Sequence, residues 1–276
     1  VLPMVAALLV ISFQALRLPI KAPEADEFYY LTIARDLSLH GVVTDGPYKR
    51  ALPDLPKDVL STADERPEAS PPGRFFGPTY PILIYVLSLA DPQLRDAIRC
   101  HVKAFGQRGD HCPNTFRTLI LANIGIATLS ATTIFLIGWS LTRSMAVAWS
   151  MLLIALATGE LGFYARTYLS ETLTVASVLV FALFGVHAMR DFRRHDFALA
   201  GGALAVAALT RPAYVYLLYG LTVLLIALPL LAHRLAPRLR LAHGVIFAVA
   251  AAIVLAPWLA RNVARFGDPA LSKGYA

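Results

Sequence analysis

Long apolar runs separated by short polar connectors dominate the chain. The clearest run, from Thr118 to Thr142, holds no charged residue and is flanked by Arg117 and Arg143. About 20 apolar residues suffice to cross a bilayer as a helix. We therefore predict an all-α polytopic membrane protein with about seven transmembrane helices. The expected spans are Val1–Ile20, Thr118–Thr142, Ser144–Gly159, Thr172–Met189, Phe197–Thr210, Pro212–Ala232 and Leu241–Ala260.

A large acidic segment, residues 21–77, follows the first apolar run and holds ten acidic residues between Glu24 and Glu68. It predicts an external loop whose first part, Glu27–His40, is a helix with apolar residues at helical spacing, suited to lying at the membrane surface. The next apolar stretch, Pro78–Ala90, has only 13 residues. It is therefore expected to be a juxtamembrane or re-entrant helix.

A second polar loop is expected over residues 91–114, and it contains the only two cysteines, Cys100 and Cys112. A disulfide between them and two free thiols are both compatible with the sequence. We expect the whole chain, residues 1–276, to form a single transmembrane module.

The charge pattern favours a membrane over nucleic acid. The chain is 57% hydrophobic and 16% charged, with a net charge of +7. Its arginines stand in short connectors between apolar runs rather than on one face interleaved with aromatic residues, so we expect membrane lipids and no nucleic acid as partners.

The basic connectors predict the orientation of the chain. Arg143 and the basic runs at 190–196 and 233–240 occupy alternate connectors, which places them on the cytoplasmic side. The acidic segment, residues 160–171, residues 210–212 and the tail after Trp258 then face outward, provided that Pro78–Ala90 does not cross the membrane.

Two adjacent carboxylates, Asp26 and Glu27, stand just after the first apolar run. Carboxylates at a membrane surface can act as general bases on an acceptor group, or hold a divalent cation with oxygen ligands. The structural alternative is that Asp26 caps the helix Glu27–His40 and Gly41 ends it.

Four further residues share the predicted outer face: Arg166, Glu171, Arg211 and Arg261. A guanidinium can give two hydrogen bonds to a phosphate, so the arginines are candidates for binding a lipid phosphate. Each can equally be an anchor at the membrane interface. Glu171 opens an apolar run, where an ionisable group needs a partner or a function.

Taken in order, several stretches resemble the GT-C class of integral membrane glycosyltransferases, in particular bacterial relatives of protein mannosyltransferases and of the lipid A aminoarabinose transferase. The stretches that carry the resemblance are Asp26–Tyr30 with Ile33–Arg35, Gly77–Pro81, Leu169–Leu173, Leu209–Pro212 and Pro257–Asn262.

The resemblance implies a transferase that moves a sugar from a polyprenyl-phosphate donor to an extracytoplasmic acceptor. It implies a catalytic base or metal-associated carboxylate at Asp26, with Glu27 as the alternate, and a further acidic site residue at Glu171. Tyr29 and Arg74 join Arg166, Arg211 and Arg261 as candidate substrate-binding residues. The metal requirement is left open, and Asp26 and Glu27 are the residues that would hold a divalent cation.

The resemblance places the protein in the bacterial inner membrane with its active face outside the cytoplasm. Only the amino-terminal transmembrane module of the class is matched, so we expect a carboxy-terminal portion or a protein partner to complete it. The alternative function is a non-catalytic membrane subunit or lipid-binding scaffold that retains the module.

Overall fold

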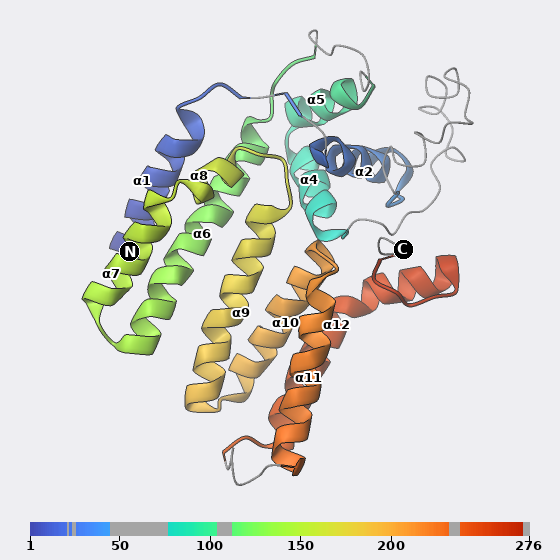
Figure 1. The fold of residues 1–276 in the computed structure, drawn as a ribbon. Coiled ribbons are helices and arrows are strands. Elements are labelled where there is room, and N and C mark those ends of the chain that lie inside the picture. The colour runs from blue at the N-terminus through green and yellow to red at the C-terminus, as the bar shows by residue number, and fades with distance from the viewer. Residues whose placement is uncertain (21, 24–25, 45–76, 104–111, 232–237, 273–276) are drawn as a thin grey trace.

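The described residues of the chain fold into helices packed side by side (Figure 1). The structure is a computed structural model that describes residues 1–276 except 21, 24–25, 45–76, 104–111, 232–237 and 273–276. The helices are α1 (Leu2–Leu16), α2 (Asp26–His40), α4 (Thr79–Ala90), α5 (Pro92–Lys103), α6 (Arg117–Thr142), α7 (Met145–Ala157), α8 (Glu160–Ala165), α9 (Glu171–Asp191), α10 (Arg194–Thr210), α11 (Tyr214–Leu231) and α12 (Leu241–Phe266).

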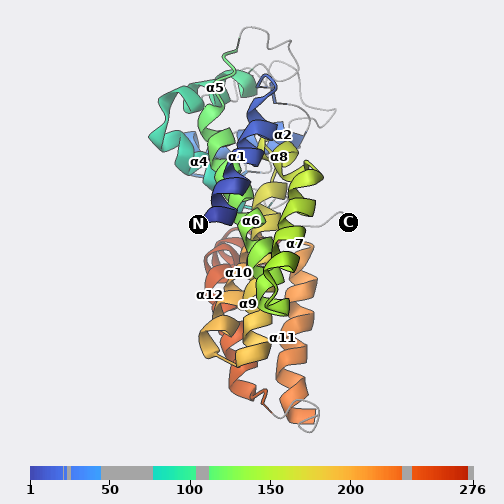
Figure 2. The ribbon, with the colours of Figure 1, turned by 90° about the vertical axis from the view of Figure 1, so that its left-hand side faces the viewer.

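The molecule has a helical bundle and a smaller group of helices at one end of it. Helices α2, α4 and α5 form this group, which we call the cap, and both views place it at one end of the bundle, beside the first turns of α6 (Figures 1 and 2). Helix α9 begins at the cap end of the bundle, and α10 returns to that end beside it. The basic connectors at Arg143 and at residues 190–196 lie at the opposite end.

Four of the described helices are long and apolar enough to cross a membrane: α6, α9, α11 and α12. Helices α1, α4 and α7 are apolar but shorter. The run expected from Ser144 to Gly159 is a helix from Met145 to Ala157, and Gly159, with φ +74°, separates it from the short helix α8. The described part of the chain thus fits a helical membrane protein with four candidate spans.

Helix α2 differs from the surface helix expected from its apolar spacing. Every residue from Tyr30 to Asp36 is buried, so neighbouring elements surround the helix instead of leaving one face open. Its polar residues are used inside the cap: the Thr32 hydroxyl donates to the Phe28 carbonyl at 2.7 Å, and the Thr44 hydroxyl donates to Asp36 Oδ2 at 2.6 Å. The predicted end of the helix is confirmed by Gly41, which adopts φ +65°.

The second polar segment is a helix over much of its length, where the sequence predicted a loop. Asp91 Oδ1 accepts the backbone N–H groups of Gln93 and Leu94 at the start of α5, which caps this helix. Its buried residues recur at helical spacing, namely Leu94, Ala97, Ile98 and Val102. Cys100 and Cys112 form a disulfide with a Cα–Cα distance of 5.7 Å. The disulfide is therefore the alternative that the structure supports.

Helix α10 is the most enclosed part of the bundle, because it packs against both α9 and α12. Small residues make this possible, and its buried set is rich in alanine, including Ala200, Ala205, Ala207 and Ala208. At Gly201 the helix touches the backbone of Phe247 in α12 so closely that a Cβ atom would collide with the Phe247 carbonyl. Close contacts of this kind suit helix association in lipid, where apolar burial alone gives little drive.

We predict that Gly201→Ala lowers the thermal stability of the purified protein in detergent. The added Cβ must push α10 away from α12, and overpacking of this kind costs typically about 1–3 kcal/mol. Gly202→Ala is the matched control, because its Cβ would meet only Val254 Cγ2 at 3.9 Å. This variant should be neutral or slightly stabilising through better helix propensity. Equal unfolding temperatures for the two variants would contradict the close contact.

Candidate functional site

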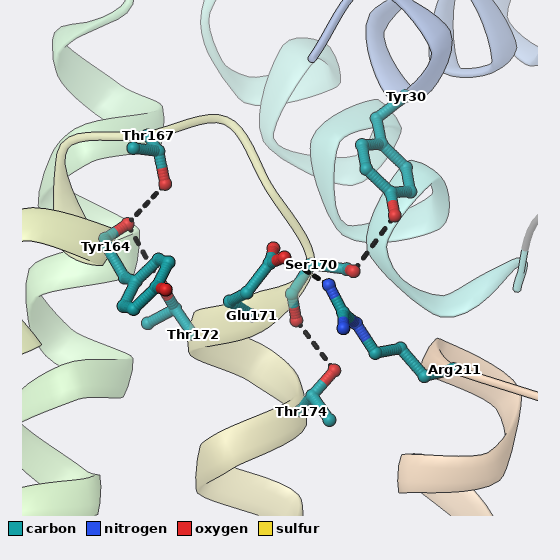
Figure 3. Close-up of polar contacts among 8 residues, drawn as sticks. All are labelled: Tyr30, Tyr164, Thr167, Ser170, Glu171, Thr172, Thr174 and Arg211. Carbon is teal, nitrogen blue, oxygen red and sulfur yellow. Dashed lines mark hydrogen bonds and ion pairs between the residues drawn. The ribbon is translucent and has the colours of Figure 1, made fainter. Parts of the chain in front are cut away.

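The candidate site lies at the cap end of the bundle, where Glu171 at the start of α9 forms an ion pair with Arg211 at the end of α10 (Figure 3). The Glu171 side chain is 23% exposed and that of Arg211 is 46% exposed, so the pair is reachable from outside. Within the part of the chain that the structure describes, Glu171 Oε2 is buried and accepts no hydrogen bond. The Arg211 guanidinium therefore has further N–H donors, and Glu171 Oε2 can still accept a hydrogen bond.

Local sequence places both charges. Ser170 and Glu171 stand at the amino end of α9, where the helix dipole favours a negative charge. Arg211 follows the last residue of α10, where a positive charge is favoured, and it adopts an extended conformation with φ −134° and ψ 108°. The following Pro212 disfavours the helical conformation at Arg211, so the helix ends there and the side chain is turned out of it.

The connector between α8 and α9, residues 166–170, joins this pair to the cap. The Tyr30 and Ser170 hydroxyls share a hydrogen bond of 2.9 Å, so α2 is held against the start of α9 (Figure 3). The backbone N–H of Tyr168 donates to Glu27 Oε1 at 3.0 Å. Glu27, the neighbour of Asp26 in the sequence, therefore directs its carboxylate at the connector.

Tyr80, on α4, is completely buried beside the same residues. Its ring meets that of Tyr30 edge to face with centroids 5.4 Å apart, and Asn123 Nδ2 donates to its hydroxyl at 3.2 Å. Burial raises the pKa of Tyr80, and the negative charges of Glu27 and Glu171 raise it further. The phenol hence remains protonated at neutral pH, and both carboxylates lie near enough to influence it.

Gly77 brings the start of α4 against the end of α10. A Cβ atom at Gly77 would collide with the carbonyl oxygens of Leu209 and Thr210, so only glycine fits without movement. Two stretches that are distant in sequence, 77–81 and 209–212, thus meet next to Arg211. The site is assembled from α2, α4, α9, α10 and the connector.

The structure brings together three of the predicted site residues: Glu27, Glu171 and Arg211. Tyr29 lies on α2 beside Tyr30 and is half-buried. Asp26 is the first residue of α2, but its side chain lies outside the described part of the structure, and so does all of Arg74.

Two predicted arginines are used elsewhere. Arg166 Nη2 donates to the Pro19 carbonyl at 3.0 Å, on the α1 side of the connector. Arg261 Nη2 donates to the Val43 carbonyl at 2.7 Å, and its guanidinium lies 4.4 Å from the Trp258 ring centroid. Arg261 therefore links α12 to the segment that follows α2.

Among the described residues, no group of three or more His, Cys, Asp or Glu side chains is arranged to hold a metal ion. Of the two predicted ligands, Glu27 has its Oε1 directed at the Tyr168 backbone, and the Asp26 side chain is not described. A divalent cation at Asp26 and Glu27 stays a prediction.

Sequence reasoning missed Tyr80, Asn123 and Ser170 as site residues. Asn123 is buried in the second turn of α6, where its Nδ2 also donates to the Thr167 carbonyl at 2.9 Å. A lone amide inside an apolar span is a detectable signal, because such a group needs a partner there. Tyr80 and Ser170 stand inside stretches 77–81 and 169–173, but their spacing gave no sign of their partners.

A scan against protein-family models finds no match to this chain, and searches of curated proteins and of solved structures find none either.

We predict that Glu171 and Arg211 are energetically coupled. In a double-mutant cycle, Glu171→Gln and Arg211→Gln should show a coupling free energy of up to about 1 kcal/mol, as expected for a partly exposed ion pair. Unfolding of the four proteins in detergent measures it. Arg190 and Asp191, whose charged atoms are 3.5 Å apart, form a comparison pair at the opposite end of the bundle. Strict additivity at Glu171 and Arg211 would contradict the ion pair.

Proposed function

We propose that the chain is a glycosyltransferase similar to the GT-C class, which transfers a sugar from a polyprenyl-phosphate donor to an acceptor outside the cytoplasm. The observation that carries the proposal is the convergence of stretches that resemble this class. Residues from 26–30, 77–81, 169–173 and 209–212 meet at one end of the bundle through Glu27, Tyr30, Gly77, Ser170 and Arg211.

In this proposal the acidic residues of α2 act on the acceptor. Asp26 removes the proton of the acceptor hydroxyl or amine as the acceptor attacks the anomeric carbon, and Glu27 is the alternate base. The bond between that carbon and the phosphate oxygen breaks, and its electron pair leaves with the lipid phosphate. Arg211 stabilises the departing phosphate with the guanidinium donors that Glu171 leaves open.

The proposed topology has about seven spans, with the cap outside the bacterial inner membrane. The basic connectors at the end opposite the cap support this orientation, because basic loops favour the cytoplasmic side. The Cys100–Cys112 disulfide supports it as well, since disulfides persist in oxidising compartments.

The alternative is a non-catalytic subunit or lipid-binding scaffold, completed by a protein partner or by a carboxy-terminal portion. The contact of Arg261 with the Val43 carbonyl favours it, because this contact joins α12 to the segment that follows α2 and needs no substrate. The two functions differ in turnover. A transferase, incubated as purified protein with short-chain polyprenyl-phosphate hexose and pentose donors, should release polyprenyl phosphate when an acceptor extract is added. A scaffold should bind the donor but release no polyprenyl phosphate.

We predict that Asp26→Asn abolishes this turnover and leaves the unfolding temperature nearly unchanged. Asp26 is the first residue of α2, and asparagine keeps the size and the side-chain oxygen of aspartate there but cannot accept the acceptor's proton. A positioned base contributes a factor of roughly 10² to 10⁴ in rate. Glu160→Gln is the control, since Glu160 is an exposed acid at the start of α8. Retained turnover, or loss of folding together with turnover, would favour a purely structural role for Asp26.

We predict that Arg211→Lys lowers turnover or raises the donor KM by at least about tenfold, which is roughly 1.4 kcal/mol. Lysine keeps the positive charge beside Glu171 but lacks the planar fork that binds a phosphate. Arg143→Lys, at the opposite end of the bundle, is the matched control and should behave like the parent protein. Parent-like kinetics for Arg211→Lys would make Arg211 an interface anchor.

A further inference from the structure

A groove lies between α1 and the two helices α7 and α8, on the side of the connector away from α2. Its volume is about 610 Å³, within the range of sites that hold small organic ligands. The α1 side is apolar and is formed by Leu9, Val10 and Phe13, and Phe163 of α8 adds an apolar wall. Leu9 and Phe13 are 65% and 68% exposed, so the groove is open to the surroundings of the bundle.

Two positive charges stand among these apolar walls. Arg17 ends α1 and is exposed, and Arg166 ends α8 and is half-buried. A guanidinium has five N–H donors, and the contact of Arg166 with the Pro19 carbonyl uses its Nη2. The described residues that line the groove include no aspartate or glutamate. An anionic group is therefore favoured there, and a cationic group finds no counter-charge.

The walls of the groove are held in place by specific contacts. Gln14 Nε2 donates to the Leu156 carbonyl at 2.9 Å, which joins α1 to the end of α7. Gly162 lets α8 approach the same side chain, because a Cβ atom there would collide with Gln14. Gly159, with φ +74°, makes the turn between α7 and α8. The groove is thus preformed by the fold.

We propose that this groove binds an acidic phospholipid, with an acyl chain along the apolar side of α1 and the phosphate between Arg17 and Arg166. The apolar walls select an amphiphile over a free anion, and the two guanidiniums suit a phosphate diester. A zwitterionic headgroup would bring a cation next to two arginines, and the described residues that line the groove include no carboxylate to bind it. The proposal does not depend on the proposed transferase activity, since the groove shares only Arg166, the first residue of the connector, with the candidate site.

The occupied groove would also steady the candidate site. Arg166 begins the connector whose next residues contact α2, through the Tyr168 backbone on Glu27 and the Ser170 hydroxyl on Tyr30. A lipid phosphate on Arg166 fixes the first residue of this connector. Binding of the lipid therefore stabilises the attachment of the cap as well as the packing of α1.

The test is binding of phosphatidylglycerol and of phosphatidylcholine to the full chain in neutral detergent, followed by native mass spectrometry and thermal unfolding. We expect the parent protein to retain phosphatidylglycerol and to unfold at a temperature several degrees higher with it, because a ligand of the folded state stabilises that state. Phosphatidylcholine should bind at least tenfold more weakly. Equal binding of the two lipids would overturn the proposal.

Paired variants distinguish binding in this groove from a general attraction of basic residues to acidic lipid. The double variant Arg17→Gln with Arg166→Gln should weaken phosphatidylglycerol binding at least tenfold. The control, Arg143→Gln with Arg193→Gln, also removes two exposed positive charges, at the opposite end of the bundle, and should bind like the parent. Equal losses in the two double variants, or no loss in the first, would overturn the assignment.

A second pair tests the apolar part of the groove without changing charge. Leu9→Trp should occlude the groove and release the lipid, whereas Ile253→Trp, at a residue of α12 that is 68% exposed, should not. Retained lipid in Leu9→Trp would overturn the proposal. So would an equal stabilisation by inorganic phosphate, which needs no apolar wall, or displacement of phosphatidylglycerol by equimolar polyprenyl phosphate, which would make this a carrier-lipid site.

Discussion

The backbone between α8 and α9 must satisfy its N–H and C=O groups without a helix, although Tyr168 and Ser170 are buried. The rest of the cap end depends on how this is done. Glu27 of α2 accepts the N–H of Tyr168, and Asn123 of α6 donates to the carbonyl of Thr167. Asn123 also holds the Tyr80 hydroxyl, so α4 is joined to the same network. The polar side chains that hold the candidate site together are therefore also the ones that satisfy backbone groups of the connector.

The long apolar helices could be predicted from the sequence, because length and absence of charge define α6, α9, α11 and α12 almost without reference to their neighbours. The cap could not be predicted in the same way. Helix α5 carries many charges, and its helical pattern is clear only when Leu94, Ala97 and Ile98 are known to be buried. The burial of α2 on all sides depends on partners that come from stretches distant in sequence.

The candidate site was predicted in part. Glu171 and Arg211 could be placed on one face because each stands at a helix end marked by local sequence, a serine before one and a proline after the other. Arg166 and Arg261 share that face by the same reasoning, yet they bind the carbonyls of Pro19 and Val43. Topology assigns a residue to a side of the bundle, whereas the direction of a long side chain depends on which acceptors lie within its reach.

The small residues in the middle of α10 affect the contacts at its cap-side end. Small side chains at Ala200, Gly201 and Ala208 let α9 and α12 approach it closely. The separation of the α9 and α10 axes in turn determines whether side chains from their cap-side ends can meet. The distance between the charges of Glu171 and Arg211 thus depends on how tightly the helices pack several turns away. A larger residue on α10 would alter the chemistry of the site without contacting any of its atoms.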